Sequence, residues 1–336
     1  MMEDKVKELL NKLEDGVKAV FDSEKYKKYL RTMSSFHNYS FNNAMLIHMQ
    51  SPDSTMVAGF NTWKKLNRYV MKGEKGITIL APCGFNSYIE KDKIDTNTNK
   101  PVINPYTGEI EKVRIPVSAN RFRAVHVFDI SQTKGEPLVM SLTEELKGSV
   151  NDYTNFLEVL KEITIYKIMF TEIEGSTKGY CDFRNKVIAI KTGMDEKQIV
   201  KTAIHEIAHS LLHGKDDKYN NEIERRAAEV QAESIAYVVC NHYDIDTSEY
   251  SFGYIANWSK DKKIEELRES LSIIQKTSDL IINNINDRHK ELNLCKEAIN
   301  ERKSLQDIKK QIEEYKQSNA FVQNNIMIKK DNMETR

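Results

Sequence analysis

Proline and glycine are distributed very unevenly along this chain of 336 residues, and this limits the folds that its two ends can adopt. All six prolines lie at or before Pro137, and no glycine follows Gly253. Because both residues interrupt helices, we expect short strands, turns and helices in the front part and long helices in the last part. The sequence therefore predicts an α+β fold that ends in a helical tail.

The length favours about two domains. We expect a first domain over residues 1–140, a second over 141–262, and a charged helical tail over 263–336. Hydrophobic residues make up 40% of the chain, which is enough for packed cores and argues against global disorder. Residues 86–118, which are rich in proline and asparagine, are expected to form a flexible hairpin or an insertion between two strands.

A membrane-bound protein and a disulfide scaffold are both disfavoured. No stretch approaches the roughly 18–20 uninterrupted apolar residues that a membrane helix requires. The N-terminal segment is charged and has no apolar signal-peptide core. The four cysteines are far apart and form no C-x-x-C pair. We therefore expect a cytoplasmic protein with no membrane partner.

The formal net charge is zero, but the charges are not evenly spread. Residues 1–140 contain 21 basic and 16 acidic side chains, and residues 141–336 contain 29 and 34. The excess is largest over residues 25–80, where nine basic residues face only Asp53 and Glu74. A polyanionic partner for the front half is therefore compatible with the neutral total.

Residues 25–80 also combine basic and aromatic side chains as single-strand binding proteins do. Such proteins hold the backbone in a basic groove and stack bases on aromatic rings. The candidate DNA contacts are Arg31, Tyr39, Asn42, Trp63, Arg68, Lys72 and Lys75. Phe60 and Tyr69 lie among them, although aromatic residues at such positions commonly fill a core. No base-reading motif is present, so we expect little sequence specificity.

The strongest chemical motif is the pentapeptide His205-Glu206-Ile207-Ala208-His209. On a helix, positions i and i+4 share a face, so both imidazoles can bind one metal ion. Glu206 would then lie beside the ion and accept a proton from a bound water molecule. This pattern predicts a Zn²⁺ site, with Glu206 as the catalytic residue of a metallopeptidase.

The next helical segment supplies acids for the third ligand. Glu229 and Glu233 are four residues apart and share a face with small side chains, which would let this helix pack closely on the histidine helix. One acid would bind the metal and the other would accept a hydrogen bond from a ligand histidine. The E-x-x-A-E pattern resembles the E-x-x-S-D of thermolysin-like gluzincins, which implies Glu229 as the ligand and Glu233 as the orienting residue. The reverse assignment is the main rival.

Two further residues near the motif have weaker chemical interpretations. His213 lies four residues after His209, whereas a metzincin would need its third histidine six residues after the second. We therefore expect His213 to contact substrate or core instead of metal. Tyr180 could donate a hydrogen bond to a developing oxyanion, although a buried structural tyrosine is the commoner case.

Longer segments resemble one known family. The peptidase-like part reads HEIAHSLLHG and then ERRAAEVQAESIAYVVC, which is similar to the metallopeptidase-like domain of the ArdC family and, more distantly, to ImmA/IrrE metallopeptidases. Residues 29–82 and 121–137 resemble the N-terminal single-stranded DNA-binding domain of the ArdC family, and residues 251–259 resemble a segment that follows the peptidase core in related proteins of Gram-positive conjugative elements. The resemblance implies an N-terminal domain that binds single-stranded DNA and a zincin domain with an unknown peptide or protein substrate. It further implies a role in protecting the incoming DNA of a mobile element from restriction.

Two alternatives remain open at this point. In the first, the protein protects DNA and its zinc ion only stabilises the fold, so that Glu206 would have no catalytic role. In the second, the protein is an ImmA/IrrE-like protease that cleaves a regulator, and the long tail contacts that partner. A structural metal site does not require a base, so the presence of Glu206 favours an enzyme.

Overall fold

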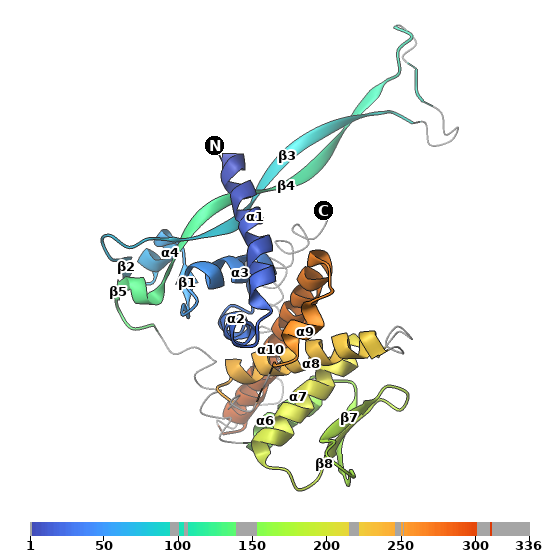
Figure 1. Ribbon diagram of the computed structural model, residues 1–336. Coiled ribbons are helices and arrows are strands. Elements are labelled where there is room, and N and C mark those ends of the chain that lie inside the picture. Colours follow the sequence, from blue (N-terminus) through green and yellow to red (C-terminus); the bar gives the residue numbers. More distant parts are fainter. Residues whose placement is uncertain are drawn as a thin grey trace. The chain divides into compact units, whose positions relative to one another are not determined.

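The computed structural model describes residues 2–94, 101–103, 107–138, 153–214, 222–245, 250, 252–300 and 310 (Figure 1). The chain divides into two compact units. The larger unit contains residues 7–79 and 126–314, and the smaller unit is built around residues 80–125. Each unit is described separately below.

Three helices begin the larger unit, and all three were predicted. They are α1 (Met2–Val20), α2 (Ser23–Ser35) and α3 (Phe41–Gln50). The Ser40 side chain accepts a hydrogen bond from the Asn43 backbone amide, so the predicted N-cap of α3 is confirmed. Apolar side chains of α2 and α3 are fully buried and form the first part of the core.

Short elements follow α3. They are β1 (Val57–Ala58), α4 (Phe60–Lys65), β2 (Arg68–Val70), a 3₁₀ turn (Ile130–Gln132) and β5 (Thr133–Gly135). Strands β2 and β5 pair antiparallel. Gly135 has φ +150°, and a Cβ atom there would lie 2.1 Å from the Asn67 carbonyl oxygen, so only glycine fits this close approach.

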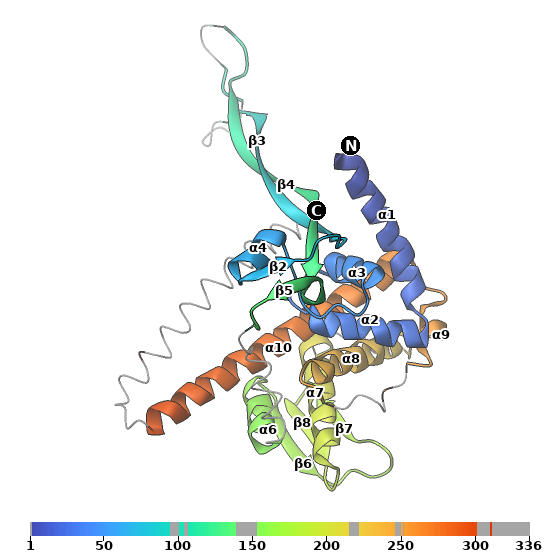
Figure 2. The ribbon, with the colours of Figure 1, turned by 90° about the vertical axis from the view of Figure 1, so that its left-hand side faces the viewer.

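Two long consecutive strands form a hairpin over residues 86–118, as one of the two predicted alternatives required. Strand β3 (Ile77–Asp92) pairs with β4 (Lys112–Asp129), as Figure 2 shows. Strand β4 in turn pairs antiparallel with β1. The hairpin is confirmed, and its strands are longer than the proline and asparagine residues of the segment suggested. Isolated bridges join Ile94 to Pro101 and Ile103 to Ile110.

The second half of the larger unit contains a small sheet covered by helices. Strand β6 (Lys167–Thr171) pairs parallel with β8 (Val187–Lys191), and β7 (Gly179–Asp182) pairs antiparallel with β8, which gives the order β6-β8-β7. Helix α7 (Glu196–Leu212) packs on β7 and β8 with one side and on α8 (Glu222–His242) with the other. The predicted hairpin and both predicted helices are confirmed.

Helix α8 is the centre of the larger unit, because α2 and α10 (Ile264–Asn300) also pack against it. Tyr26 of α2 is hydrogen-bonded to the Ser234 hydroxyl of α8 at 2.8 Å, and both side chains are fully buried. On α10, the Gln275 amide donates hydrogen bonds to three backbone carbonyls that follow α2. The predicted helical tail is therefore part of the core over this stretch.

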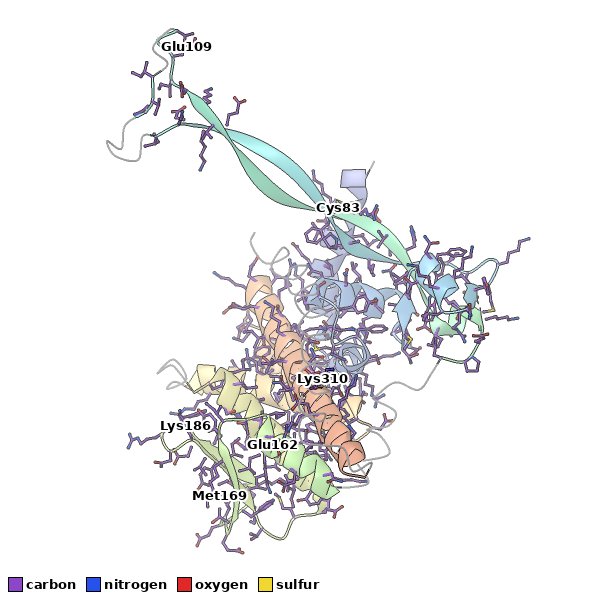
Figure 3. All side chains as sticks on the ribbon, turned by 180° about the vertical axis from the view of Figure 1, so that it is seen from behind. Cys83, Glu109, Glu162, Met169, Lys186 and Lys310 are labelled. Atoms are coloured by element: carbon purple, nitrogen blue, oxygen red, sulfur yellow. The ribbon has the colours of Figure 1, made fainter. Side chains whose placement is uncertain are left out.

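Two shorter helices complete the unit. Helix α6 (Tyr153–Glu162) packs on α7 and α10, and its last residue, Glu162, forms an ion pair with Arg288 of α10 (Figure 3). Helix α9 (Ile255–Ser259) contacts α2 and α8. The predicted α+β class is confirmed, whereas the predicted domain boundaries stay a prediction. No helix among the described residues is long and apolar enough to cross a membrane.

Candidate metal centre

Helix α7 presents the HEIAH motif from a fixed position. The Asp195 side chain accepts a hydrogen bond from the Gln198 amide and so caps the N-terminus of the helix. Ala203, Ile204, Ile207 and Ala208 are fully buried. One side of the helix therefore belongs to the core, and His205 and His209 extend one turn apart toward α8.

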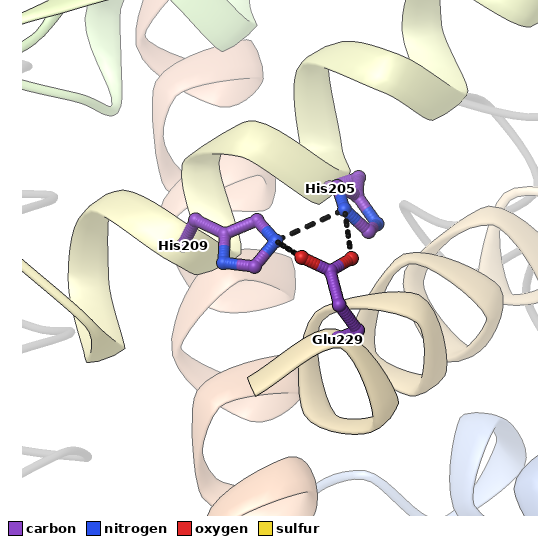
Figure 4. Close-up of side chains that lie close together, drawn as sticks. All are labelled: His205, His209 and Glu229. Atoms are coloured by element: carbon purple, nitrogen blue, oxygen red, sulfur yellow. Dashed lines mark hydrogen bonds and ion pairs between the residues drawn. The ribbon is translucent and has the colours of Figure 1, made fainter. Parts of the chain in front are cut away.

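Three donor atoms converge between α7 and α8 (Figure 4). The Nε2 atoms of His205 and His209 are 3.0 Å apart, and each lies 3.5 Å from a different carboxylate oxygen of Glu229. Zinc ligands at about 2.0–2.1 Å in tetrahedral geometry are separated from one another by about 3.3 Å. The spacing of the three side chains thus fits one small divalent cation.

Glu233 lies on the other side of the His205 ring. One of its carboxylate oxygens is 3.5 Å from His205 Nδ1, while Glu229 faces Nε2. A carboxylate near Nδ1 accepts a hydrogen bond from the Nδ1–H group, which leaves the Nε2 lone pair directed at the metal position. This geometry is the one that the assignment of Glu229 as ligand and Glu233 as orienting residue requires.

A second orienting chain holds His209, and sequence reasoning missed its role. His209 Nδ1 lies 2.8 Å from Nδ1 of the buried His213, whose Nε2 lies 3.2 Å from the side-chain oxygen of Gln231. If the Gln231 oxygen accepts a hydrogen bond from His213 Nε2–H, then His213 Nδ1 accepts a hydrogen bond from His209 Nδ1–H. His209 Nε2 is then unprotonated and free to bind a metal. The sequence signal for this contact was the spacing: His213 lies one further turn along α7, and Gln231 lies on α8 close to Glu229.

The electrostatic environment favours positive charge at this point. Burial alone would lower the pKa of His205, but Glu229 and Glu233 beside it raise that pKa to about 10. Hydrogen bonding to His205 and His209 holds the pKa of Glu229 well below its usual range. Burial and the neighbouring His209 lower the pKa of His213 to about 4, which suits a neutral acceptor. Surroundings that stabilise a cation so strongly suit a metal ion.

Glu206 is placed beside the donors and not among them. Its side chain is 7% exposed, and burial raises its pKa, although the two motif histidines oppose this. It lines a cavity of about 300 Å³ together with His205, Glu233, Lys201 and Gly179. A carboxylate with a raised pKa at the wall of a cavity is suited to accept and return a proton.

Strand β7 runs past this cavity. A Cβ atom at Gly179 would lie 2.6 Å from the Thr202 side chain and 3.4 Å from Glu206 Cγ, so glycine allows the strand to approach α7 closely. Among the described strands β7 pairs only with β8, and its other edge is open. Tyr180 is 49% exposed and alternates with Gly179 and Cys181, so it points to the opposite face. The suggested oxyanion role of Tyr180 is therefore wrong.

Several predicted DNA contacts have structural roles in the first half of the chain. Trp63 is fully buried, and its indole N–H donates a hydrogen bond to the Phe128 carbonyl at 2.9 Å. It offers no face to a base, which corrects its assignment as a stacking residue. Tyr39 is partly buried and its hydroxyl donates to the Val57 carbonyl. The Arg68 guanidinium donates to Thr133 and to the Glu136 carbonyl, and so holds β2 against β5.

Arg31 and Asn42 face the helices of the second half. Arg31 Nε donates to the Tyr237 hydroxyl of α8 at 3.0 Å, and Arg268 of α10 donates to the Asn42 side-chain oxygen at 3.4 Å. Both residues therefore join parts of the larger unit. The structure brings neither of them to Lys72 and Lys75, which follow β2 and are exposed.

Exposed aromatic and basic side chains do occur together around α4 and β2. Phe60 is 55% exposed and Tyr69 is 57% exposed, and exposed lysines lie in the same short stretch. We call this the α4–β2 surface, and it comprises Phe60, Lys64, Lys65, Tyr69, Lys72 and Lys75. The sequence contained these residues, but six-residue α4 is too short for periodicity to show that Trp63 points inward and Phe60 outward.

Two family models match the chain. Residues 1–128 match the N-terminal domain of anti-restriction factor ArdC, and residues 162–256 match the IrrE N-terminal-like domain of the M78 peptidases. The second match contains the whole histidine and glutamate cluster. The chain is also similar to an uncharacterized protein of Bacillus anthracis, with 28% identity over 91% of this chain and 56% of that relative. The chain thus spans about half of that relative's length.

Solved structures of the antirestriction protein ArdC from the R388 plasmid are also similar. Its metal-free structure has 19% identity and a TM-score of 0.42, and its Mn(II)-bound structure has 15% identity and a TM-score of 0.43. In both comparisons the similarity covers 74% of this chain and 85% of the other.

Proposed function

Because the chain joins an ArdC N-terminal domain to an IrrE N-terminal-like domain of the M78 peptidases, we propose that it binds single-stranded DNA and hydrolyses peptide bonds with zinc. In this proposal it protects incoming DNA of a mobile element from restriction. The observation that carries the enzymatic part is the convergence of His205, His209 and Glu229 beside the buried Glu206.

The roles of the side chains follow from their positions. His205, His209 and Glu229 would hold the cation, while Glu233 and His213 fix the two imidazole rings. A zinc ion bound there would polarise a substrate carbonyl and lower the pKa of a coordinated water molecule to about 7. Glu206 accepts a proton at its carboxylate and returns it to the leaving amine, and its raised pKa suits both transfers.

The substrate would be an extended peptide. The open edge of β7 can pair with a peptide backbone as an additional strand, and Gly179 brings that edge within contact of Glu206. Backbone pairing of this kind selects for an extended conformation and requires no particular side chain. It therefore positions a carbonyl group near the metal centre without defining the sequence.

The DNA-binding part would use the α4–β2 surface. Its lysines can neutralise phosphates, and the rings of Phe60 and Tyr69 are available for stacking, which is worth about 1–3 kcal/mol per base. Lys72 and Lys75 remain from the predicted set, whereas Trp63 does not. Sequence-independent binding that weakens with salt is expected from such a surface.

The deciding experiment separates metal binding from hydrolysis. The full-length protein is loaded with Zn²⁺ and incubated with a proteome-derived peptide library, and cleavage is followed by mass spectrometry. Glu206→Gln should reduce cleavage by about 10²- to 10⁴-fold, because it removes the proton acceptor. It should leave the zinc content unchanged, because Glu206 is not a ligand.

The matched control is Glu265→Gln, which changes an exposed acid in the first turn of α10. This control should cleave at the wild-type rate. Wild-type protein that is fully loaded with zinc but cleaves no peptide would contradict the enzymatic proposal and favour a non-catalytic metal site.

A further inference from the structure

A second cavity, of about 850 Å³, borders the candidate metal centre at Glu229. Its walls come from α8, from α9 and Tyr254 before it, from the chain between α9 and α10, and from the first turn of α10. Besides Glu229 its lining includes Val230, Tyr254, Asn257, Trp258 and Lys262. Ligand sites in proteins typically enclose about 300–1,000 Å³, so the space is large enough for one or two substrate residues.

Apolar and aromatic side chains form part of the wall. Val230 is buried, and Trp258 packs on Phe21 with ring centroids 5.9 Å apart. Tyr254 is 44% exposed, so part of its ring is accessible. Because Trp258 and Val230 are held by the core, this wall exists before any ligand arrives.

The charges around the cavity nearly cancel. Its lining contains three basic side chains (Arg225, Arg226 and Lys262) and three acidic ones (Glu229, Asp261 and Glu266). Lys262 Nζ lies 5.0 Å from the centroid of the Trp258 ring. A balanced rim gives no net attraction for a phosphate backbone, so the chemistry that distinguishes this cavity is its aromatic wall.

The cavity beside Glu206 differs in character. Most of its lining is polar, including Lys178, Gln198, the buried Lys201, Glu206 and Glu233, and its one aromatic lining residue is Tyr250. The two cavities meet the metal cluster at different residues, since one touches His205 and the other touches Glu229. A peptide at the metal centre would therefore meet a mainly polar lining with Tyr250 on one flank, and on the other a lining that adds Val230, Tyr254 and Trp258 to its charged residues.

We propose that the cavity beyond Glu229 is a specificity pocket that receives a bulky apolar side chain, aromatic or long aliphatic, adjacent to the cleaved peptide bond. This inference rests on the proposed metal centre, because the side chain is placed relative to a substrate bound there. Tyr254 and Trp258 would be specificity-determining residues that contact the substrate side chain. Burial of the additional apolar surface would make such peptides bind more tightly than their alanine counterparts.

The test uses two dipeptide hydroxamates that differ only in carrying a benzyl or a methyl side chain. A hydroxamate binds the metal directly, so the comparison requires no turnover. With the zinc-loaded full-length protein, the benzyl compound should bind about 10- to 100-fold more tightly than the methyl compound. Asn257→Trp adds bulk to the exposed rim of the cavity and should reduce this ratio to about 2 or less.

Tyr254→Ala is the second variant, and it should also reduce the ratio because part of the aromatic wall is lost. Tyr254 is half exposed, so this change is compatible with folding. Leu280→Ala is the matched control, because Leu280 is 48% exposed on α10 and does not line the cavity. In Leu280→Ala the ratio of the affinities for the benzyl and methyl compounds should equal that of the wild type.

Three results would overturn the inference in distinguishable ways. If neither hydroxamate binds, the metal centre itself fails and the pocket fails with it. If both bind equally, or if the ratio is unchanged in Asn257→Trp and Tyr254→Ala, the metal centre stands and the pocket is excluded. If a short oligothymidylate displaces the benzyl compound and Asn257→Trp prevents this, the cavity binds nucleotides and not a peptide side chain.

Discussion

The candidate metal centre and the α4–β2 surface are built in opposite ways. At the metal centre, the donor side chains come from two helices that pack directly on each other, and the partners Glu233 and His213 hold the two histidine rings. On the α4–β2 surface, Phe60 and Tyr69 project more than half of their area into solvent. The two histidine rings of the first site are held by their partners, although the Glu229 side chain is itself 63% exposed, whereas the second site depends on charge and accessibility.

This difference predicts how each site responds to substitution. A metal site loses affinity sharply when one donor is removed, because each of its few ligands contributes a large share of the binding. An exposed surface of several lysines and two rings loses affinity in small steps, because each residue contributes separately. Substitutions at the two sites should therefore differ most at the proposed metal ligands.

The largest effect is expected at Glu229. Glu229→Gln removes a carboxylate that faces both Nε2 atoms, and we expect zinc affinity to fall by more than about 100-fold, as measured by competition with a chromophoric chelator. Glu233→Gln should cost about 10- to 100-fold, because orienting residues act through the ligand that they hold. A larger loss for Glu233→Gln would reverse the two roles, and equal losses would contradict the distinction between ligand and orienting residue.

How far the sequence predicts this contrast depends on how local each pattern is. His205, Glu206 and His209 lie within one helical turn and a half, so spacing alone brings them together. Glu229 and Glu233 could be predicted as well, because they lie on the next helix along the chain. By contrast, the contact of His213 with Gln231 depends on how α7 packs on α8, and that packing cannot be deduced from spacing along one helix.

The N-terminal half was harder to predict for a related reason. Trp63 and Phe60 both lie in a single short helix, where an aromatic residue next to lysines is compatible with either a core or a binding role. The structure assigns Trp63 to the core through its contact with Phe128, which is distant in sequence. In the proline- and asparagine-rich segment the predicted hairpin is present, but turn residues gave no indication of how long its two strands are.

Trp63 is fully buried and Tyr69 is exposed, so their substitution should affect different properties of the protein. Trp63→Ala should lower the free energy of unfolding by about 3–5 kcal/mol, because it leaves a cavity and an unpaired Phe128 carbonyl. Tyr69→Ala should leave stability nearly unchanged and weaken binding of an oligothymidylate by about 1–3 kcal/mol. Urea unfolding gives the stability, and fluorescence anisotropy at several salt concentrations gives the affinity.

Glu136→Gln is a useful control, because it removes an exposed charge near β2 and leaves both aromatic rings intact. It should not lower the affinity. If Tyr69→Ala and Lys72→Glu both bind DNA as the wild type does, the α4–β2 surface is not the DNA-binding site.

The smallest effect concerns pH and tests whether the N-terminal helices also contain a fixed polar contact. His48 Nδ1 lies 2.8 Å from the Thr32 hydroxyl, and burial, assisted by Lys28, lowers the pKa of His48 from 6.5 to about 4. The unfolded chain therefore takes up a proton at His48 before the folded chain does. Stability should fall as pH decreases from about 6.5 to about 4, and this loss should be absent above that range.

The contribution of His48 is isolated by comparing urea unfolding of the wild type and His48→Gln at pH 7.5 and at pH 5. The full shift corresponds to about 3 kcal/mol, but the ring is partly accessible to solvent, so we expect a difference of about 1–2 kcal/mol between the two pH dependences. Other histidines titrate in both proteins and cancel in this difference. If the two proteins show parallel pH dependences, His48 is not held neutral in the folded chain. The N-terminal helices would then lack a fixed polar contact of the kind that holds the histidine rings at the metal centre.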